Sequence, residues 1–80
     1  MKRSSNQIKI DILKICRTPQ RITHIMYKTN TYYNRLKKDL TELIKKGMLT
    51  KTQNSKAIFY STTRKGKDVI KEFEEFIDLM

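Results

Sequence analysis

The sequence has very little of the residues that build metal centres and disulfides. Cys16 is its one cysteine and His24 its one histidine, so a single chain has neither an intrachain disulfide nor a closed zinc site made of cysteine and histidine. The two glycines leave no glycine-rich phosphate loop. The longest apolar runs, such as residues 57–60, are far too short to span a bilayer, and the polar opening MKRSSNQ is unlike a signal peptide. We therefore expect a cytoplasmic protein with no cofactor, no metal and no membrane partner.

Acidic residues are also scarce, and they are unevenly placed. Eight Asp and Glu residues stand against 18 Lys and Arg residues, which gives a formal net charge of +10. Residues 1–67 hold 17 basic and 3 acidic residues, whereas residues 68–80 hold 5 acidic residues and one lysine. Such a surplus favours a polyanionic partner. Because the carboxylates are scattered and His24 stands alone, there is no paired acid and base and no activated nucleophile, so we expect no enzyme.

The first amphipathic segment predicts a scaffold helix. It begins at Ser4 or Ser5, since Ser4 and Gln7 fit a capping box, and apolar residues follow at helical spacing. The helix must end before Pro19, and residues 17–21 form a connection that often adds a short strand in folds of this kind. Cys16 is interpreted as a buried free thiol, with a disulfide between two copies as the alternative.

Two further helices separated by a short polar turn follow. The first begins at Thr23, whose hydroxyl is expected to cap it while Ile22 packs on Tyr27. Asn30 suits a left-handed turn conformation, and Thr31 is expected to cap the next helix, over about residues 31–46, which ends before a glycine. A buried stripe is predicted along that helix, formed by Tyr33, Leu36, Leu40, Leu43 and Ile44.

The opposite face of the 31–46 helix is basic and rich in hydrogen-bonding groups. A helix placed in this way after a turn is the usual element that reads a DNA major groove. We expect DNA contacts from Thr31, Tyr32, Asn34, Arg35, Lys37 and Lys38. Arg35 suits a guanine edge and Asn34 an adenine, whereas Lys37 and Lys38 suit phosphates. The alternative is an ordinary solvated face, on which Glu42 pairs with Lys38, Lys45 and Lys46 of the same helix and Asp39 also forms surface ion pairs.

Residues 48–61 predict two short strands around a turn at Asn54 and Ser55. Lys51 and Lys56 lie beside this turn. A basic hairpin at this point would act as a wing along the DNA backbone or minor groove. The alternative is a plain hairpin that covers the core and leaves Lys56 solvated.

Residues 63–80 predict a strongly amphipathic last helix that Thr63 caps. Its acidic polar face argues against binding to DNA or to a membrane surface. We expect a dimer interface, joined by the first helix, from Val69, Ile70, Phe73, Phe76, Ile77 and Met80. The alternative is a helix that packs only on its own core.

Several segments together resemble a known family over about residues 8–77. They are THIMY at 23–27, YNRLKKDL at 33–40, KGML at 46–49, and Tyr60 followed by TRKGK at 63–67. They are similar to archaeal winged-helix regulators and chromatin proteins, whose pattern runs T-x-I-M-Y, Y-x-x-L-K-K-x-L-x-x-L-x-x-x-G-L and Y-x-x-T-x-x-G. The resemblance implies a dimer joined through its C-terminal helices and a role in transcription or DNA organisation. Two features depart from the pattern: Asp39 stands where the family usually has an aromatic or apolar residue, and the sequence ends at Met80. Both departures favour a compact viral, plasmid or host regulator.

The expected fold is therefore α+β and mainly helical. It is a winged helix-turn-helix of three helices, a β-hairpin wing and a C-terminal amphipathic helix, with residues 1–80 as a single domain and 63–80 as a dimerisation helix. The expected function is a homodimeric regulator of transcription that binds double-stranded DNA and takes no small-molecule ligand. The alternatives are an architectural DNA binder of weak selectivity and a winged helix that contacts another protein.

Overall fold

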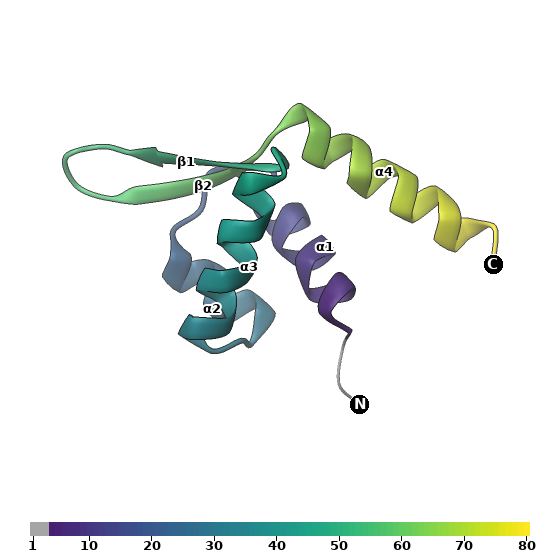
Figure 1. Cartoon of the computed structure of the whole chain (residues 1–80), viewed down its shortest axis with the longest axis horizontal. Coiled ribbons are helices and arrows are strands. Elements are labelled where there is room, and N and C mark those ends of the chain that lie inside the picture. The colour runs from purple at the N-terminus through teal and green to yellow at the C-terminus, as the bar shows by residue number, and fades with distance from the viewer. Residues whose placement is uncertain (1–3) are drawn as a thin grey trace.

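The computed structural model describes residues 4–80, and its helices and strands follow the predicted order. Figure 1 shows three helices gathered below a hairpin, with a last helix that runs away on the opposite side. The elements are α1 (Ser5–Ile15), α2 (Ile22–Thr29), α3 (Tyr33–Lys45), β1 (Leu49–Gln53), β2 (Ile58–Thr62) and α4 (Arg64–Asp78). Within residues 4–80, no helix is long and apolar enough to cross a membrane.

Side-chain caps begin α1 and α4 as the sequence predicted. Ser4 accepts a hydrogen bond from the amide of Gln7 at 3.1 Å, although the Gln7 side chain reaches forward to Asp11 and leaves the capping box half formed. Thr63 accepts from the amide of Gly66 at 3.2 Å and donates to the carbonyl of Gly47 at 2.6 Å. One hydroxyl thus caps α4 and ties it to the end of α3.

The predicted starts of α2 and α3 were wrong by one or two residues. The residue before α2 is Arg21 and the residue before α3 is Tyr32, and neither helix has a side-chain cap. The hydroxyl of Thr31 lies instead 2.7 Å from that of Thr29. Tyr27 is 81% exposed, so it forms no staple with Ile22. Tertiary packing of α2, whose Ile25 and Thr29 are fully buried, sets these boundaries more strongly than local capping does.

Backbone turns occur at the residues that the sequence indicated. Asn30 ends α2 with φ 52°, and Gly47 follows α3 with φ 78°, a left-handed conformation that glycine adopts at no steric cost. In the hairpin, the side chain of Asn54 accepts from the amides of Lys56 and Ala57, each at 2.8 Å. These turns confirm the predicted helix-turn-helix and hairpin.

The two strands pair antiparallel, from Leu49 opposite Thr62 to Gln53 opposite Ile58. A third short segment joins them, because Gln20 exchanges backbone hydrogen bonds of 3.0 and 2.8 Å with Tyr60. The expected extra strand between the first two helices is therefore present as a single bridge. It fixes the base of the hairpin against the chain that leads into α2.

A core lies between the helices and the base of the hairpin. Every helix and both strands contribute to it, through Ile12, Leu13, Cys16, Ile25, Leu36, Leu40, Leu43, Leu49, Tyr60 and Ile70. Two expectations about the core were wrong. Tyr33 is 49% exposed because it lies in the first turn of α3, beyond the edge of the core, and Asp39 is 2% exposed.

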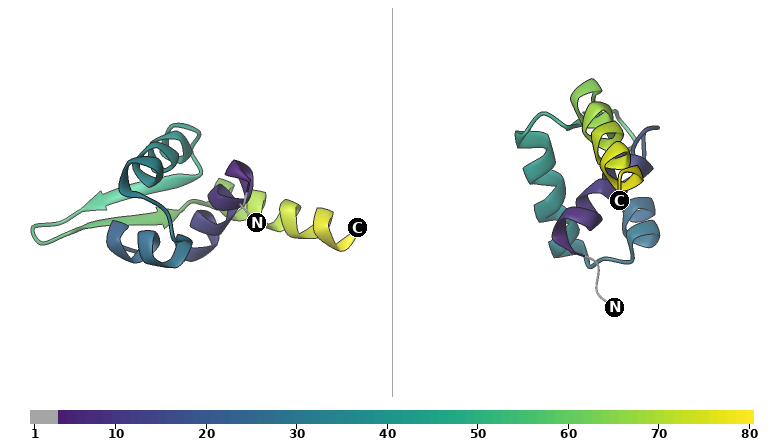
Figure 2. Two further views of the ribbon diagram at one scale, coloured as in Figure 1. Left: turned by 90° about the horizontal axis from the view of Figure 1, so that it is seen from below. Right: turned by 90° about the vertical axis from the view of Figure 1, so that its right-hand side faces the viewer.

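The first turn of α4 packs tightly on the end of α3. A Cβ atom on Gly66 would fall inside contact distance of the Met48 carbonyl and the Thr62 methyl, so the backbone of α4 lies directly against this segment. The ammonium group of Lys65 donates to the carbonyl of Lys46 at 2.8 Å and so caps α3. Beyond this anchored turn α4 extends to the opposite end of the molecule from the hairpin (Figure 2).

Candidate nucleic-acid interface

The N-terminal half of α3 presents most of the predicted DNA-contacting side chains to solvent. Tyr32 is 86% exposed, and Asn34, Lys37 and Lys38 are also exposed. Thr31 differs from these residues because its hydroxyl proton is engaged. Since Thr29 donates its one hydroxyl proton to the carbonyl of Ile25, Thr31 must be the donor in the 2.7 Å pair between the two hydroxyls.

Arg35 lies on the flank of the same helix, and its partner is one turn away. Its Nε atom donates to Oδ2 of Asp39 at 3.2 Å; the Arg35 side chain is 43% exposed and that of Asp39 only 3%. The expected surface pairing of Asp39 was therefore wrong, because this carboxylate is buried. The acidic side chain by itself indicated a surface position, whereas the resemblance, in which an aromatic or apolar residue usually stands here, was the signal that could have indicated burial.

Glu42, the second acidic residue of α3, pairs across to α1. Its Oε2 atom lies 2.7 Å from Nζ of Lys9, whereas the sequence predicted partners among the lysines of its own helix. The hydrogen bond and the positive charge of Lys9 lower the pKa of Glu42 below its ordinary value of 4.5, with smaller contributions from Lys38 and Lys46. Both carboxylates of α3 thus have cationic partners, Arg35 for Asp39 and Lys9 for Glu42.

The hairpin carries both predicted wing residues, and of the two only Lys56 lies at its tip. Lys51 lies on β1 and Lys56 in the turn, and both side chains are exposed. Figure 1 shows the hairpin projecting well beyond the helices, with its tip far from α4. The two lysines are therefore displayed on the end of the molecule that lacks the acidic residues of α4.

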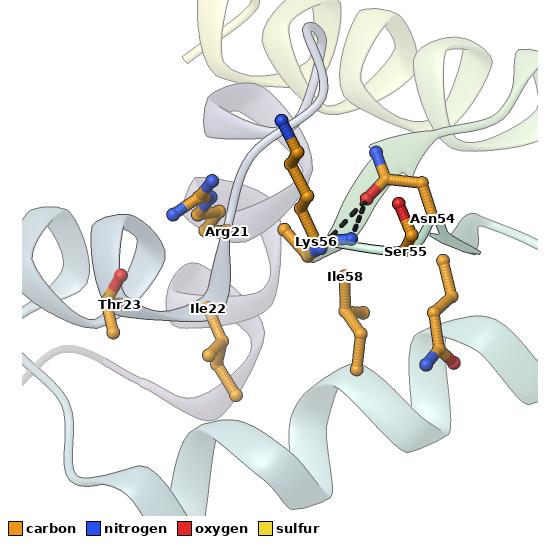
Figure 3. Close-up of a pocket in the computed structure, with 9 residues that line it drawn as sticks. Arg21, Ile22, Thr23, Asn54, Ser55, Lys56 and Ile58 are labelled. Atoms are coloured by element: carbon orange, nitrogen blue, oxygen red, sulfur yellow. Dashed lines mark hydrogen bonds between the residues drawn. The ribbon is translucent and has the colours of Figure 1, made fainter.

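A pocket that the sequence did not reveal lies between the hairpin and the start of α2. It has a volume of about 470 Å³, and Arg21 and Thr23 line it on one side while Asn54 and Lys56 line it on the other. In Figure 3, Arg21 lies on the chain that leads into α2 and Lys56 lies on the hairpin. The guanidinium of Arg21 lies 5.7 Å from the centre of the Phe59 ring, in cation–π contact. This juxtaposition depends on the tertiary fold, because more than 30 residues separate Arg21 from Lys56 in the sequence.

The acidic residues of α4 lie away from α3 and the hairpin. Asp68, Glu72 and Glu75 share one surface with Lys71. Arg17, at the end of α1, reaches Glu74 at 3.4 Å. The left view of Figure 2 shows α4 pointing away from the hairpin, so its acidic residues lie at the other end of the molecule from the hairpin lysines. That α4 is no DNA surface stays a prediction.

The apolar residues predicted for a dimer interface divide between the core and the surface. Ile70 is 1% exposed and belongs to the core of its own chain, so its side chain faces no partner. Val69 and Phe73 are half-buried and border a groove of about 300 Å³ that α1 and α3 also line. An exposed apolar surface is left at the end of α4, formed by Phe76, Ile77, Met80 and the additional residue Leu79.

Cys16 and His24 lie in different environments. Cys16 is buried as predicted, and burial raises the pKa of its thiol to about 12, so it carries no thiolate near neutral pH. His24 is exposed on α2, as expected. Within residues 4–80, no three His, Cys, Asp or Glu side chains come close enough to hold a metal ion.

Comparisons with known proteins agree with this arrangement. The sequence profile of the winged helix-turn-helix family matches residues 2–80. A crystal structure of Sso10a-2, described as a DNA-binding protein from Sulfolobus solfataricus, superimposes with a TM-score of 0.86 at 32% identity, covering 96% of this chain and 81% of that one. No curated protein sequence matches this chain. The predicted fold class and the predicted resemblance are both confirmed, and the chain belongs to the winged helix-turn-helix family.

Proposed function

We propose that this protein binds double-stranded DNA as a homodimer and regulates transcription, with α3 in the major groove. The observation that carries the proposal is the exposed N-terminal half of α3, which presents Asn34, Lys37 and Lys38. The two carboxylates of this helix are each already paired with another cationic side chain. The likeness to Sso10a-2, whose structure is described as that of a DNA-binding protein, supports the same assignment.

Each exposed side chain of α3 has a role that suits its chemistry. Asn34 offers the donor and acceptor that match an adenine edge, and Arg35 the fork that matches guanine. Lys37 and Lys38 suit phosphates, as does the hydroxyl of Tyr32, which stands at the helix N-terminus. Thr31 supports the turn through Thr29 and offers phosphate no free proton.

The hairpin supplies a second contact with the DNA backbone or minor groove. Lys51 on β1 and Lys56 in the turn have no acidic partners among residues 4–80. Arg21 and Lys56 both line the pocket beside α2, so cationic residues from two elements border it. A backbone phosphate is the anion that this placement suits.

The apolar end of α4 supports the homodimer. Phe76, Ile77 and Met80 are at least 49% exposed, which is a large apolar surface for a chain of 80 residues. Residues of α1 also line the groove beside Val69 and Phe73, which is the placement expected if α1 joins the interface. A second copy would bury these side chains and present two α3 helices, for half-sites about one helical turn, or roughly 34–36 Å, apart.

A binding titration over a salt series tests the proposal. The protein is titrated onto DNA from upstream of its own gene and onto a shuffled duplex of equal composition, and affinity is followed by fluorescence anisotropy. We expect tighter binding to the upstream duplex that persists as salt rises. Replacing Lys38 with alanine should weaken binding to both duplexes alike and reduce the salt slope by about one.

Lys71→Ala is the matched control, because it removes one lysine from the acidic surface of α4. It should leave the preference for the upstream duplex unchanged. Equal affinities that fall together with salt would assign the protein to architectural DNA binding instead. Binding to neither duplex would overturn the proposal and favour a surface for a protein partner.

A further inference from the structure

The pairing of Arg35 with Asp39 fixes one edge of the guanidinium and leaves the other edge open. Only the Nε atom donates to the Asp39 carboxylate, at 3.2 Å. Within residues 4–80, Arg35 makes no other hydrogen bond or ion pair, so both terminal amino groups lack a protein partner. Those two groups form the fork that donates to O6 and N7 of guanine.

Burial of the Asp39 side chain makes this pairing durable. The side chain is 3% exposed, and an ionised carboxylate at such a site is costly unless it is paired. Arg35 is the only cation that pairs with it in the described chain. A long arginine side chain that swings freely must lose rotamer freedom when it binds a base, whereas one already held by a carboxylate loses less.

The same carboxylate reduces the attraction of Arg35 for phosphate. Its negative charge offsets the guanidinium charge at short range, while the hydrogen-bonding fork stays available. An unpaired arginine at this position would bind any nearby phosphate and so strengthen binding to every sequence. The pairing therefore favours base reading over backbone binding.

We propose that Asp39 is a positioning residue that holds Arg35 for guanine recognition and limits its use as a phosphate contact. This inference rests on the proposed function, because it concerns the same face of α3. It assigns guanine as the base that the α3 N-terminal half reads through Arg35. Removal of the carboxylate should have two opposite effects, a lower preference for guanine and a higher affinity for unrelated DNA.

Selection from a random duplex library provides the test. The wild-type protein is used to obtain its preferred duplex, and affinities are then measured for duplexes in which each guanine in turn is replaced by 7-deazaguanine, which lacks N7. We expect one guanine in each half-site whose replacement weakens wild-type binding about fivefold or more. For Asp39→Asn the same replacement should weaken binding by less than twofold, and its affinity for the shuffled duplex should rise.

Glu42→Gln is the matched control, because it also removes one negative charge from an ion-paired carboxylate of α3. Its guanine dependence should equal that of the wild type, even if its affinity for all DNA rises through the added net charge. Arg35→Lys should lose the dependence, since an ammonium group lacks the fork. Asp39→Leu removes the carboxylate and places an apolar side chain in the buried site; it serves as the second variant in case Asp39→Asn does not fold.

The outcomes separate this inference from the proposed function. Failure of the wild type to select any duplex would overturn the proposed function, and this inference with it. Selective wild-type binding, together with an unchanged guanine dependence in both Asp39 variants, would overturn only the inference. Loss of the dependence in folded Asp39 variants, as judged by circular dichroism, would establish it.

Discussion

The ammonium group of Lys9 lies 2.7 Å from a carboxylate oxygen of Glu42 and links α1 to α3. The Lys9 side chain is 21% exposed and that of Glu42 38%, so the pair lies at the edge of the interface between the two helices. α3 also carries the proposed DNA contacts. The pair therefore joins the scaffold helix to the helix proposed to bind DNA, and it is expected to contribute to stability.

We predict that this pair makes stability depend on acid pH. Lys9 lowers the pKa of Glu42 in the folded protein below the ordinary value of 4.5. The resulting stabilisation is present above pH 4.5 and is lost as the pH falls through the folded pKa. Glu42→Gln should therefore lower the melting temperature at pH 7 and flatten its decline in acid. Thermal melts by circular dichroism between pH 7 and pH 3 measure this difference.

Glu72→Gln is the control for that experiment, since Glu72 is exposed on α4 and forms no ion pair within residues 4–80. The melting temperature of this variant should fall with decreasing pH as that of the wild type does. An acid profile of Glu42→Gln that matches the wild type would show that the Lys9 pair does not contribute to stability.

We predict that Gly66→Ala destabilises the fold, although alanine favours a helix by about 1 kcal/mol over glycine. The added Cβ would collide with the Met48 carbonyl, and backbone cannot move aside as a side-chain end does. The expected net loss is about 1–3 kcal/mol in the free energy of unfolding, measured by urea titration. Lys67→Ala, at the next and exposed position, should leave stability nearly unchanged. A variant at Gly66 as stable as the wild type would contradict the tight packing.

We predict that Cys16 is unreactive in the native protein. The side chain is fully buried, and burial raises the pKa of the thiol to about 12, so neither access nor thiolate is available at pH 8. Iodoacetamide should modify the native protein far more slowly than the protein in denaturant, as followed by mass spectrometry. Rapid native modification, or a disulfide-linked dimer under mild oxidation, would contradict this placement.

We predict that Phe76→Ser converts a dimer into a monomer that keeps its fold. Phe76 is 60% exposed in the single chain, so its loss removes little from the core and much from the proposed interface. Sedimentation equilibrium should give twice the chain mass for the wild type and the chain mass for the variant. Lys71→Ala, on the acidic surface of α4, should remain dimeric. A wild type that sediments as a monomer at micromolar concentration would rule out the α4 interface.

Local features of the sequence predicted those parts of the fold that depend on neighbouring residues. Ser4 and Thr63 cap helices because their hydroxyls reach amides three residues away. Asn30 and Gly47 form left-handed turns because their backbones tolerate positive φ. Helical spacing of apolar residues predicted the buried face of α3 for the same reason, since the period of the helix is itself a local property.

Features that depend on distant segments were missed or misplaced. The sequence predicted ion pairs between Glu42 and lysines of its own helix, whereas its partner, Lys9, lies on α1. Tyr33 was predicted to be buried because it continues the apolar stripe, but the core does not extend to the first turn of α3. No sequence spacing indicates that Arg21 and Lys56 border one pocket, because only the tertiary fold places the hairpin turn beside the start of α2.

The sequence by itself determined the element order, the turns, the basic face of α3 and the acidic character of α4, because these follow from local propensity and from charge. Only the tertiary structure decided that Asp39 is buried beneath Arg35 and that Ile70 belongs to the core while Phe76 does not. The physical reason is that burial depends on which surfaces meet, and the apolar period of a helix does not record where its partner ends.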